Sequence, residues 1–140
     1  MIQIRQTSWA EDEPILREIR QKVFVQEQNV PEHDEWDDED ATSTHFLAIN
    51  EKRDAVGSGR LQPNGKITRM AVLPAWRGKG VGALLLEALL VAAVQDGKAI
   101  PWLHAQVDAI GFYSQYGFAG EGEPFDEAGI QHSLMRMTRT

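Results

Sequence analysis

The segment that most constrains how this chain can fold is a glycine-rich run between a strand-like and a helix-like stretch. Three glycines stand at every second position in Arg77-Gly78-Lys79-Gly80-Val81-Gly82, between the apolar stretches 66–73 and 83–94. Glycine lets the backbone approach a ligand closely, and a helix start behind it offers unpaired N–H groups. We therefore predict a cradle for the phosphates of a nucleotide-like cofactor, to which Arg77 and Lys79 add positive charge.

The spacing differs from two better-known phosphate loops. No Gly-Lys pair is followed by Ser or Thr, as in a Walker A loop, and the glycines at 78, 80 and 82 do not fit G-x-G-x-x-G. A tight strand-to-helix connection that needs glycine only for its geometry is the alternative. The flanking residues, described below, favour the phosphate cradle.

The length and composition indicate one globular domain over residues 1–140. The net charge of −7 argues against general nucleic-acid binding, and the absence of cysteine excludes disulfides and cysteine nucleophiles. The first residues lack the pattern of a signal peptide, and Glu87 interrupts the longest apolar run, 81–94, which is shorter than the ~20 residues that span a bilayer. We expect a cytoplasmic protein that binds neither membrane nor nucleic acid.

The remaining pattern predicts one α/β domain with a mixed sheet. The acidic segment Glu32–Asp40 is expected to be a loop or a short helical turn, because seven of its nine residues are acidic. The predicted helices are 14 to 27 or 28, 81–95 (ended by residues 96–97) and 108–116, and the predicted strands are 2–4, 45–50, 55–61, 66–73, 99–106, one from 118, and 133–138.

The residues around the glycine run resemble the acyl-CoA-binding segment of the GNAT superfamily of N-acetyltransferases. Arg77, Gly80 and Gly82 match its Arg/Gln-x-x-Gly-x-Gly/Ala motif, and 109–118 is similar to its Ala-x-x-Phe-Tyr-x-x-x-Gly-Phe segment. The N-terminal third, including 23–31, resembles the ElaA/YjcF-type branch. One departure is Gln106, where many relatives carry Asn.

This resemblance implies a single-domain α/β (α+β) GNAT fold. Its central sheet would be mixed and mostly antiparallel, with a splayed parallel strand pair and about four flanking helices. It further implies an acetyl-CoA-dependent N-acetyltransferase without a metal, in which a primary amine of a small molecule or peptide attacks the thioester directly. The implied cofactor-binding residues are Met70, Ala71, Val72, Arg77, Gly78, Lys79, Gly80, Val81, Gly82, Gln106 and Tyr113.

The resemblance also implies specific roles in catalysis. The pantetheine arm would lie along residues 70–73, with the Val72 N–H directed at the thioester carbonyl, and Tyr113 would protonate the leaving thiolate. Simple packing of the Tyr113 ring is the alternative, and we expect Tyr116 to do no more than that.

The base that deprotonates the incoming amine is open at this point. Glu27 and His104 are candidates, and His132 is a third. The alternatives are a solvated helix end for Glu27, a hydrogen-bonded core residue for His104 and a surface-loop residue for His132.

The acidic segment Glu32–Asp40 permits several interpretations. A solvated loop is the commonest, a collar that attracts a cationic acceptor such as a polyamine is another, and a calcium loop lacks its central glycine.

Two other functions stay open. Arg20-x-x-x-Phe24 and Glu35-x-Asp37-x-x-Asp40 resemble acyl-homoserine-lactone synthases, which share the fold. A non-catalytic domain that binds acetyl-CoA as a sensor is the second of these functions.

The oligomeric state is open as well. A homodimer is an alternative to a monomer, because GNAT domains often pair.

Overall fold

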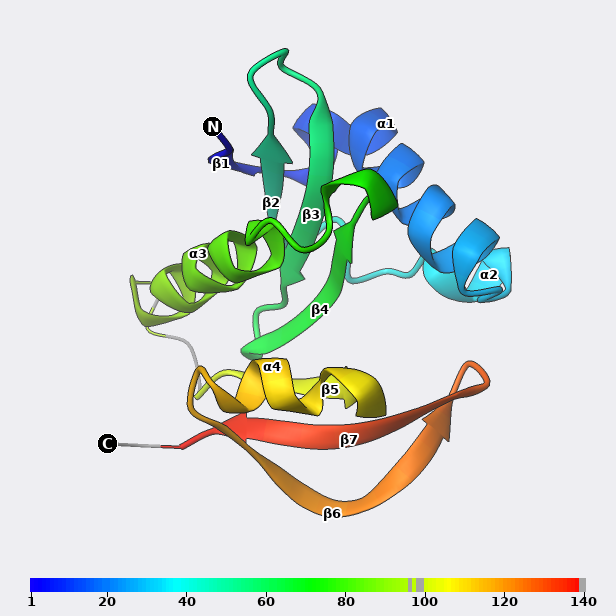
Figure 1. The fold of residues 1–140 in the computed structure, drawn as a ribbon, viewed down its shortest axis with the longest axis vertical. Coiled ribbons are helices and arrows are strands. Elements are labelled where there is room, and N and C mark those ends of the chain that lie inside the picture. Colours follow the sequence, from blue (N-terminus) through cyan, green and yellow to red (C-terminus); the bar gives the residue numbers. More distant parts are fainter. Residues whose placement is uncertain (96, 98–99, 139–140) are drawn as a thin grey trace.

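The described part of the chain folds around one seven-stranded mixed sheet with the strand order β1-β2-β3-β4-β5-β7-β6 (Figure 1). The structure is a computed structural model that describes residues 1–95, 97 and 100–138. Neighbouring strands run antiparallel except β4 and β5, which run parallel. The strands are β1 (Gln3–Thr7), β2 (Thr44–Ile49), β3 (Ala55–Leu61), β4 (Lys66–Val72), β5 (Trp102–Gln106), β6 (Phe118–Glu127) and β7 (Ile130–Met137). The predicted mixed, mostly antiparallel sheet is confirmed.

Within the described residues, four α-helices accompany the sheet, as predicted: α1 (Trp9–Arg20), α2 (Glu32–Glu35), α3 (Val81–Gln95) and α4 (Ile110–Ser114). A π-helical segment, η1 (Gln21–Glu27), continues α1, and the short turns η2 (Pro74–Trp76) and η3 (Val107–Ala109) precede α3 and α4. Helix α3 lies on one side of strands β2 to β4, and α1 and α2 lie on the other (Figure 1). None of the helices in the described ranges is long and apolar enough to cross a membrane.

The first helix begins earlier than its apolar spacing predicts. Helix α1 starts at Trp9 rather than Pro14, because the Ser8 hydroxyl accepts a hydrogen bond from a backbone N–H of the first turn. The backbone leaves helical geometry at Asp12 (φ −130°), so Pro14 falls just after a kink, where its missing N–H is tolerated. The helical segment ends at Glu27 as predicted, but its last seven residues are π-helical, an uncommon geometry that is frequent at functional sites.

Two strand predictions near the C-terminus need correction. The strand predicted from residue 99 begins at Trp102, while residue 99 itself and the helix stop predicted at residue 96 lie outside the described residues. Strand β7 begins at Ile130 rather than at residue 133. His132 therefore lies inside a strand and is only 7% exposed, so the surface-loop interpretation was wrong.

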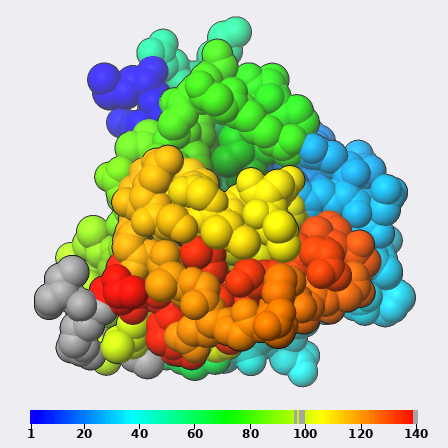
Figure 2. Space-filling model, turned by 60° about the horizontal axis from the view of Figure 1, so that its bottom comes forward, coloured from blue at the N-terminus to red at the C-terminus, as the bar shows by residue number. Residues whose placement is uncertain are grey.

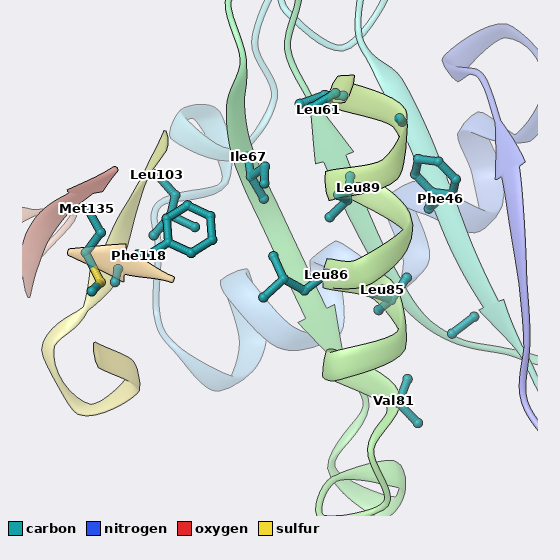
Figure 3. Packing of buried hydrophobic residues seen from close by; sticks show 14 of the residues in the cluster. Phe46, Leu61, Ile67, Val81, Leu85, Leu86, Leu89, Leu103, Phe118 and Met135 are labelled. Atoms are coloured by element: carbon teal, nitrogen blue, oxygen red, sulfur yellow. The ribbon is translucent and has the colours of Figure 1, made fainter. Parts of the chain in front are cut away.

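Each face of the sheet has its own apolar core. Alternate residues of β2 point to opposite faces, so Phe46 belongs to the core under α3 and Leu47 to the core under α1. In Figure 3, Leu85, Leu86 and Leu89 of α3 lie against the sheet, and all three are fully buried. Each such side chain contributes about 1.5–3 kcal/mol to folding. These cores fix α1 and α3 on the two faces.

Strands β4 and β5 separate soon after they meet. Their register contains only the pairs Lys66–Trp102 and Ile67–Leu103. Beyond Ile67, the edge of β4 that faces β5 has no partner strand in the described structure. This is the splayed parallel pair that the resemblance implies.

A cluster of charged side chains, most of them buried, holds the segment that contains α2 against the sheet. Its members, which we call the buried ion cluster, are Arg20, Arg60, Arg69, Glu35, Asp37 and Asp40. Arg20 donates to Glu35 Oε2 and Asp40 Oδ1, each at 2.7 Å. Arg60 donates to Asp37 Oδ1 at 2.7 Å and to Asp40 Oδ1 at 2.8 Å. Glu35 and Asp40 are each only 2% exposed, so the solvated-loop interpretation was wrong for them.

The cluster shifts the pKa values of its carboxyl groups in different directions. Burial raises the pKa of Glu35, and the nearby charges of Arg69 and Arg20 only partly offset it. Burial also opposes ionisation of Asp40, but its hydrogen bonds and charge pairing with Arg20 and Arg60 prevail and lower its pKa. The arginines thus favour the carboxylate form of Asp40.

Replacing Arg20 tests how much this cluster contributes to the free energy of unfolding. Arg20→Met should reduce the free energy of unfolding by about 3–5 kcal/mol, because it leaves buried carboxylates short of partners. Urea unfolding measures the change. Lys22→Met is the matched control, since Lys22 is exposed and pairs with Glu18 across one helical turn, and it should cost less than about 0.5 kcal/mol. A loss below about 1 kcal/mol for Arg20→Met would contradict the role of the cluster.

The pH dependence of stability should report on His45, which is 1% exposed and donates from Nε2 to the Asp40 carbonyl at 2.9 Å. Burial lowers the pKa of His45. The unfolded chain therefore takes up this proton first, so stability should fall as the pH drops below about 6.5, the ordinary histidine value.

Unfolding of His45→Gln across this pH range should show a shallower slope. His33→Gln should keep the wild-type slope, because the His33 side chain is 84% exposed. Equal slopes in His45→Gln and wild type would refute the assignment.

Candidate active site

A pocket of about 530 Å³ opens where β4 and β5 separate. Its walls come from β4, β5, β7, α4 and the segment after α1, so residues far apart in the sequence meet there. In Figure 2, the hairpin of β6 and β7 (orange to red) lies beside the light-blue segment that follows α1. Of the residues predicted from sequence, the pocket brings together Met70, His104, Gln106, Tyr113 and His132.

Strand β4 presents backbone donors to this pocket. A register shift against β3 accompanies Arg69, which has a left-handed backbone (φ 56°). The Leu73 N–H bonds to the Val56 carbonyl of β3 at 2.9 Å. Because successive N–H groups point to opposite sides of a strand, the N–H of Val72 points away from β3, toward the open edge. Ala71 is 3% exposed and packs into the core under α1, so its side chain is not available to a ligand.

The glycine loop joins β4 to α3 in an open conformation. Gly78 and Gly80 have φ values of +75° and +82°, and no atom lies within 4 Å of the position that a Cβ would take at either residue. A side chain at either position would strain the backbone. The first bond of the following helix runs from the Leu84 N–H to the Gly80 carbonyl. The N–H groups of residues 81–83 therefore lack partners within the helix and face the loop, as an anion cradle requires.

Arg77 is held by a glutamate from the other side of the sheet. Its Nη1 and Nη2 each donate to a carboxylate oxygen of Glu27 at 2.6 Å, and its Nε donates to the Val72 carbonyl at 2.9 Å. The hydrogen bond from Arg77 lowers the pKa of Glu27, which makes this carboxylate a weaker base. The Glu27 side chain does not line the pocket that holds the other candidate bases.

Tyr113 reaches the pocket from α4. Its hydroxyl donates to Met70 Sδ at 3.6 Å, and burial raises the pKa of Tyr113 to about 12. The phenol is therefore a neutral hydrogen-bond donor throughout the physiological pH range. Its ring contacts Phe112 and Phe118 edge to face, with centroid distances of 5.1 and 6.0 Å. These contacts fix the direction of the hydroxyl.

Gln106 is engaged by the segment that follows η1. Its Nε2 donates to Gln28 Oε1 at 2.9 Å, across the opening between the strands. Gln28 was not among the residues predicted from the sequence. Glu27 and Gln28 are consecutive, and each holds one predicted cofactor-binding side chain. A cofactor that uses Arg77 and Gln106 would replace both contacts.

Two histidines and a glutamate form a second polar group at the pocket wall. The Glu127 carboxylate contacts His104 Nδ1 at 2.8 Å and lies 3.8 Å from His132 Nε2. His132 Nδ1 donates to the Ile130 carbonyl at 2.7 Å. Sequence reasoning missed Glu127. A signal existed in the following Ala128-Gly129 pair, whose positive φ values make the two-residue hairpin turn that brings β6 back beside β7.

The pocket is not uniformly acidic. Asp34 and Glu35 reach it, but so do Lys66 and Arg69 of β4, and burial lowers the pKa of both of these cations. The carboxylates of Glu35 and Asp37 pair with arginines of the buried ion cluster. This neutralisation argues against a collar of free carboxylates around the acceptor. The described residues contain no group of three or more side chains arranged to hold a metal ion.

Similarity to known proteins extends over nearly the whole chain. Residues 11–139 match the family model for the acetyltransferase (GNAT) domain. The uncharacterized N-acetyltransferase YjcF of Bacillus subtilis is 37% identical over 121 residues, which cover 84% of this chain and 86% of YjcF. An acyl-CoA N-acyltransferase from Pseudomonas aeruginosa is similar with a TM-score of 0.88, 28% identity and coverage of 99% and 100%. Escherichia coli ElaA is similar with a TM-score of 0.87, 27% identity and coverage of 97% and 99%.

These similarities confirm the ElaA/YjcF-type resemblance. A CoA-dependent acyl-homoserine lactone synthase, BjaI, has a TM-score of 0.77 over 99% of this chain and 85% of its own, but only 18% identity. That likeness is one of fold alone.

The contact between Glu27 and Arg77 generates a binding prediction. Glu27→Gln should tighten CoA binding about two- to five-fold, because an exposed ion pair worth up to ~1 kcal/mol no longer competes for Arg77. Calorimetric titration with CoA measures the change. Glu18→Gln is the charge-matched control, since Glu18 is exposed and pairs with Lys22, and it should have no effect. Weaker binding by Glu27→Gln would mean that Glu27 orients Arg77 for the ligand instead.

Proposed function

The chain belongs to the GNAT acetyltransferase family, and we propose that it transfers the acetyl group of acetyl-CoA to a primary amine. Membership makes it an acyltransferase of a family that uses acyl-CoA donors. The acetyl group, the amine and the residue roles are the proposal. The observation that carries it is the open edge of β4, which lies between the glycine loop and Tyr113 at the one place where two parallel strands separate.

The donor would occupy this opening in an extended form. The pyrophosphate suits the glycine loop, where Gly78 and Gly80 leave room and the N–H groups at the start of α3 supply donors. The pantetheine arm suits the free edge of β4, which can pair with it as with an added strand, from Met70 to Val72. Gln106 supplies an amide on the opposite strand. The Val72 N–H would then donate to the thioester oxygen, worth ~3 kcal/mol as negative charge develops there.

Tyr113 would act on the leaving group. In the reaction the amine nitrogen attacks the carbonyl carbon, the C–S bond breaks, and the sulfur leaves as a thiolate. A typical thiol has a pKa of about 8.5, well below the pKa of about 12 of Tyr113. The phenol would therefore stabilise the thiolate as a hydrogen-bond donor and keep its own proton.

The incoming amine must lose a proton before it attacks. Glu27 is poorly placed for this, since Arg77 occupies both of its oxygens. His104 lines the pocket together with Met70 and Tyr113, where the thioester would lie. His104 is therefore the better candidate for the base. The pocket volume of about 530 Å³ suits a small amine or one side chain of a peptide.

Two measurements test the proposal. Calorimetry with acetyl-CoA measures donor binding, and a thiol-release assay measures turnover with spermidine, phenethylamine, glycinamide and a lysine-containing peptide. We expect binding and turnover with at least one of these amines, with the acetylated nitrogen identified by mass spectrometry. Binding without amine-dependent thiol release would contradict N-acetylation, and the absence of binding would contradict the donor.

Replacing the phenol tests the role of Tyr113. Tyr113→Phe should lower kcat by about 10²-fold or more, while the KM for acetyl-CoA stays close to that of the wild type, because the hydroxyl acts on charge that develops only during the reaction. Steady-state thiol release measures both constants. Tyr116→Phe is the matched control, since Tyr116 packs beside Phe112 with a ring-centroid distance of 5.4 Å, and it should keep wild-type kcat. Equal constants for both variants would assign Tyr113 to packing alone.

A further inference from the structure

We infer that Glu127 is a positioning residue that fixes His104 as the proton acceptor for the incoming amine. The inference rests on the proposed function and adds a residue to it. Neither the glycine-loop motif nor the Tyr113 segment includes Glu127. It lies at the end of β6, outside both of the matching segments.

The sheet register places His104 on the face that lines the pocket. Leu103 and Ala105 of β5 are 2% and 1% exposed and belong to the core under α3. Side chains alternate along a strand, so His104 and Gln106 point to the opposite face, toward the segment after α1. His132 pairs directly with Gln106 across β5 and β7 and shares that face.

The hairpin brings Glu127 to both imidazoles. Glu127 pairs with Ile130 at the start of β7, next to the two-residue turn. From there its carboxylate reaches across β7 to His104 Nδ1 at 2.8 Å. The Phe125 ring packs edge to face on His104, with a centroid distance of 4.9 Å, and stacks on His132 at 6.2 Å. The imidazole of His104 is thus held by one hydrogen bond and by two ring contacts, since Trp102 also packs edge to face on it with a centroid distance of 5.6 Å.

This geometry selects the tautomer of His104. The Glu127 carboxylate can only accept, so Nδ1 of His104 carries the hydrogen and Nε2 keeps its lone pair. Nε2 is then the nitrogen that accepts a proton from the ammonium group of the acceptor, and the carboxylate stabilises the imidazolium that forms. The His104 side chain is 20% exposed, so the proton can pass on to solvent and restore the neutral ring. His132 differs, because the Ile130 carbonyl accepts its Nδ1 hydrogen and its Nε2 is the nitrogen that lies near the Glu127 carboxylate, at 3.8 Å.

Position in the pocket distinguishes this group from an ordinary surface ion pair. His104 precedes Gln106 by two residues on the same face, about 7 Å along the strand, and both line the pocket with Met70 and Tyr113. A base on β5 and a hydroxyl from α4 thus face one reaction space. The other charged groups that line the pocket are Asp34, Glu35, Lys66 and Arg69. Glu35 and Arg69 pair with each other at 3.0 Å, whereas the Glu127 carboxylate contacts His104.

Glu127→Gln tests the inference, with Glu121→Gln as the matched control. Glu121 lies on the same strand, and its carboxylate pairs with Arg136 at 2.8 Å instead of with a histidine. Long-range ¹H–¹⁵N NMR of the full chain should show the Nδ1–H tautomer of His104 in the wild type and in Glu121→Gln. In Glu127→Gln the Nε2–H tautomer should gain population, since a carboxamide does not select one ring nitrogen. This measurement needs neither donor nor acceptor.

Kinetics supply the second readout. With the fastest amine of the panel, Glu127→Gln should lower kcat about 10- to 100-fold, because His104 is no longer held with Nε2 free for the proton of the amine. Acetyl-CoA affinity should not change.

An unchanged His104 tautomer in Glu127→Gln, or kinetics equal to those of Glu121→Gln, would overturn the positioning role and leave the proposed function intact. A wild type that turns over no amine would overturn the proposed function, and the catalytic role of His104 with it.

Discussion

The buried ion cluster is the interaction on which the N-terminal half of the structure depends. Removing charged groups from water costs several kcal/mol for each ion, and the cost is offset only where partners meet with good geometry. Arg20 satisfies this requirement by bonding to Glu35 and Asp40, two residues of a segment with little regular structure of its own. The segment can therefore take few positions other than the observed one, across β3 and β4. That position makes it one wall of the pocket.

The pocket itself opens where β4 and β5 separate. The backbone N–H and C=O groups of the inner strands of a sheet are normally hydrogen-bonded to neighbouring strands. An unpaired edge inside a domain costs free energy and is uncommon unless it serves a function. Here the register shift at Arg69 and the two-pair contact between β4 and β5 leave such an edge beside a pocket. An extended ligand that pairs with this edge would recover the missing hydrogen bonds. The same separation admits Tyr113 from α4 and His104 from β5 to a common space.

The sequence predicted the regular elements well where one physical signal dominated. The nearly continuous apolar run of α3 and the apolar stretches of β2 to β4 correspond to two cores on opposite faces. The predictions failed where a local contact overrides periodicity. The Ser8 cap places the start of α1 at Trp9, before the predicted start at Pro14. The π-helical geometry of η1 has no distinct apolar pattern that the sequence could reveal. The two-residue turn at Ala128-Gly129 extended β7 to include His132.

The candidate site was predictable in the same uneven way. Contiguous motifs predicted the glycine loop and Tyr113 as site residues, because each belongs to a short run whose spacing is typical of one kind of site. Glu127 and Gln28 belong to no such run, and their relevance comes only from the strands and helices that carry them to His104 and Gln106. The acidic segment shows the same limit, since its composition indicates solvent exposure while its partners are arginines distant in sequence.

By itself, then, the sequence determined the order of strands and helices, the glycine loop between β4 and α3, and the family to which the chain belongs. These properties depend on neighbouring residues and on short spacings, which a linear pattern records. The tertiary structure alone decided which carboxylates are buried with arginines, that Arg77 is held by Glu27, and that Glu127 meets His104. Such pairings join residues from 15 to 50 positions apart. They arise from strand register and from the need to pair buried charges, and no local stretch of the sequence specifies either of these.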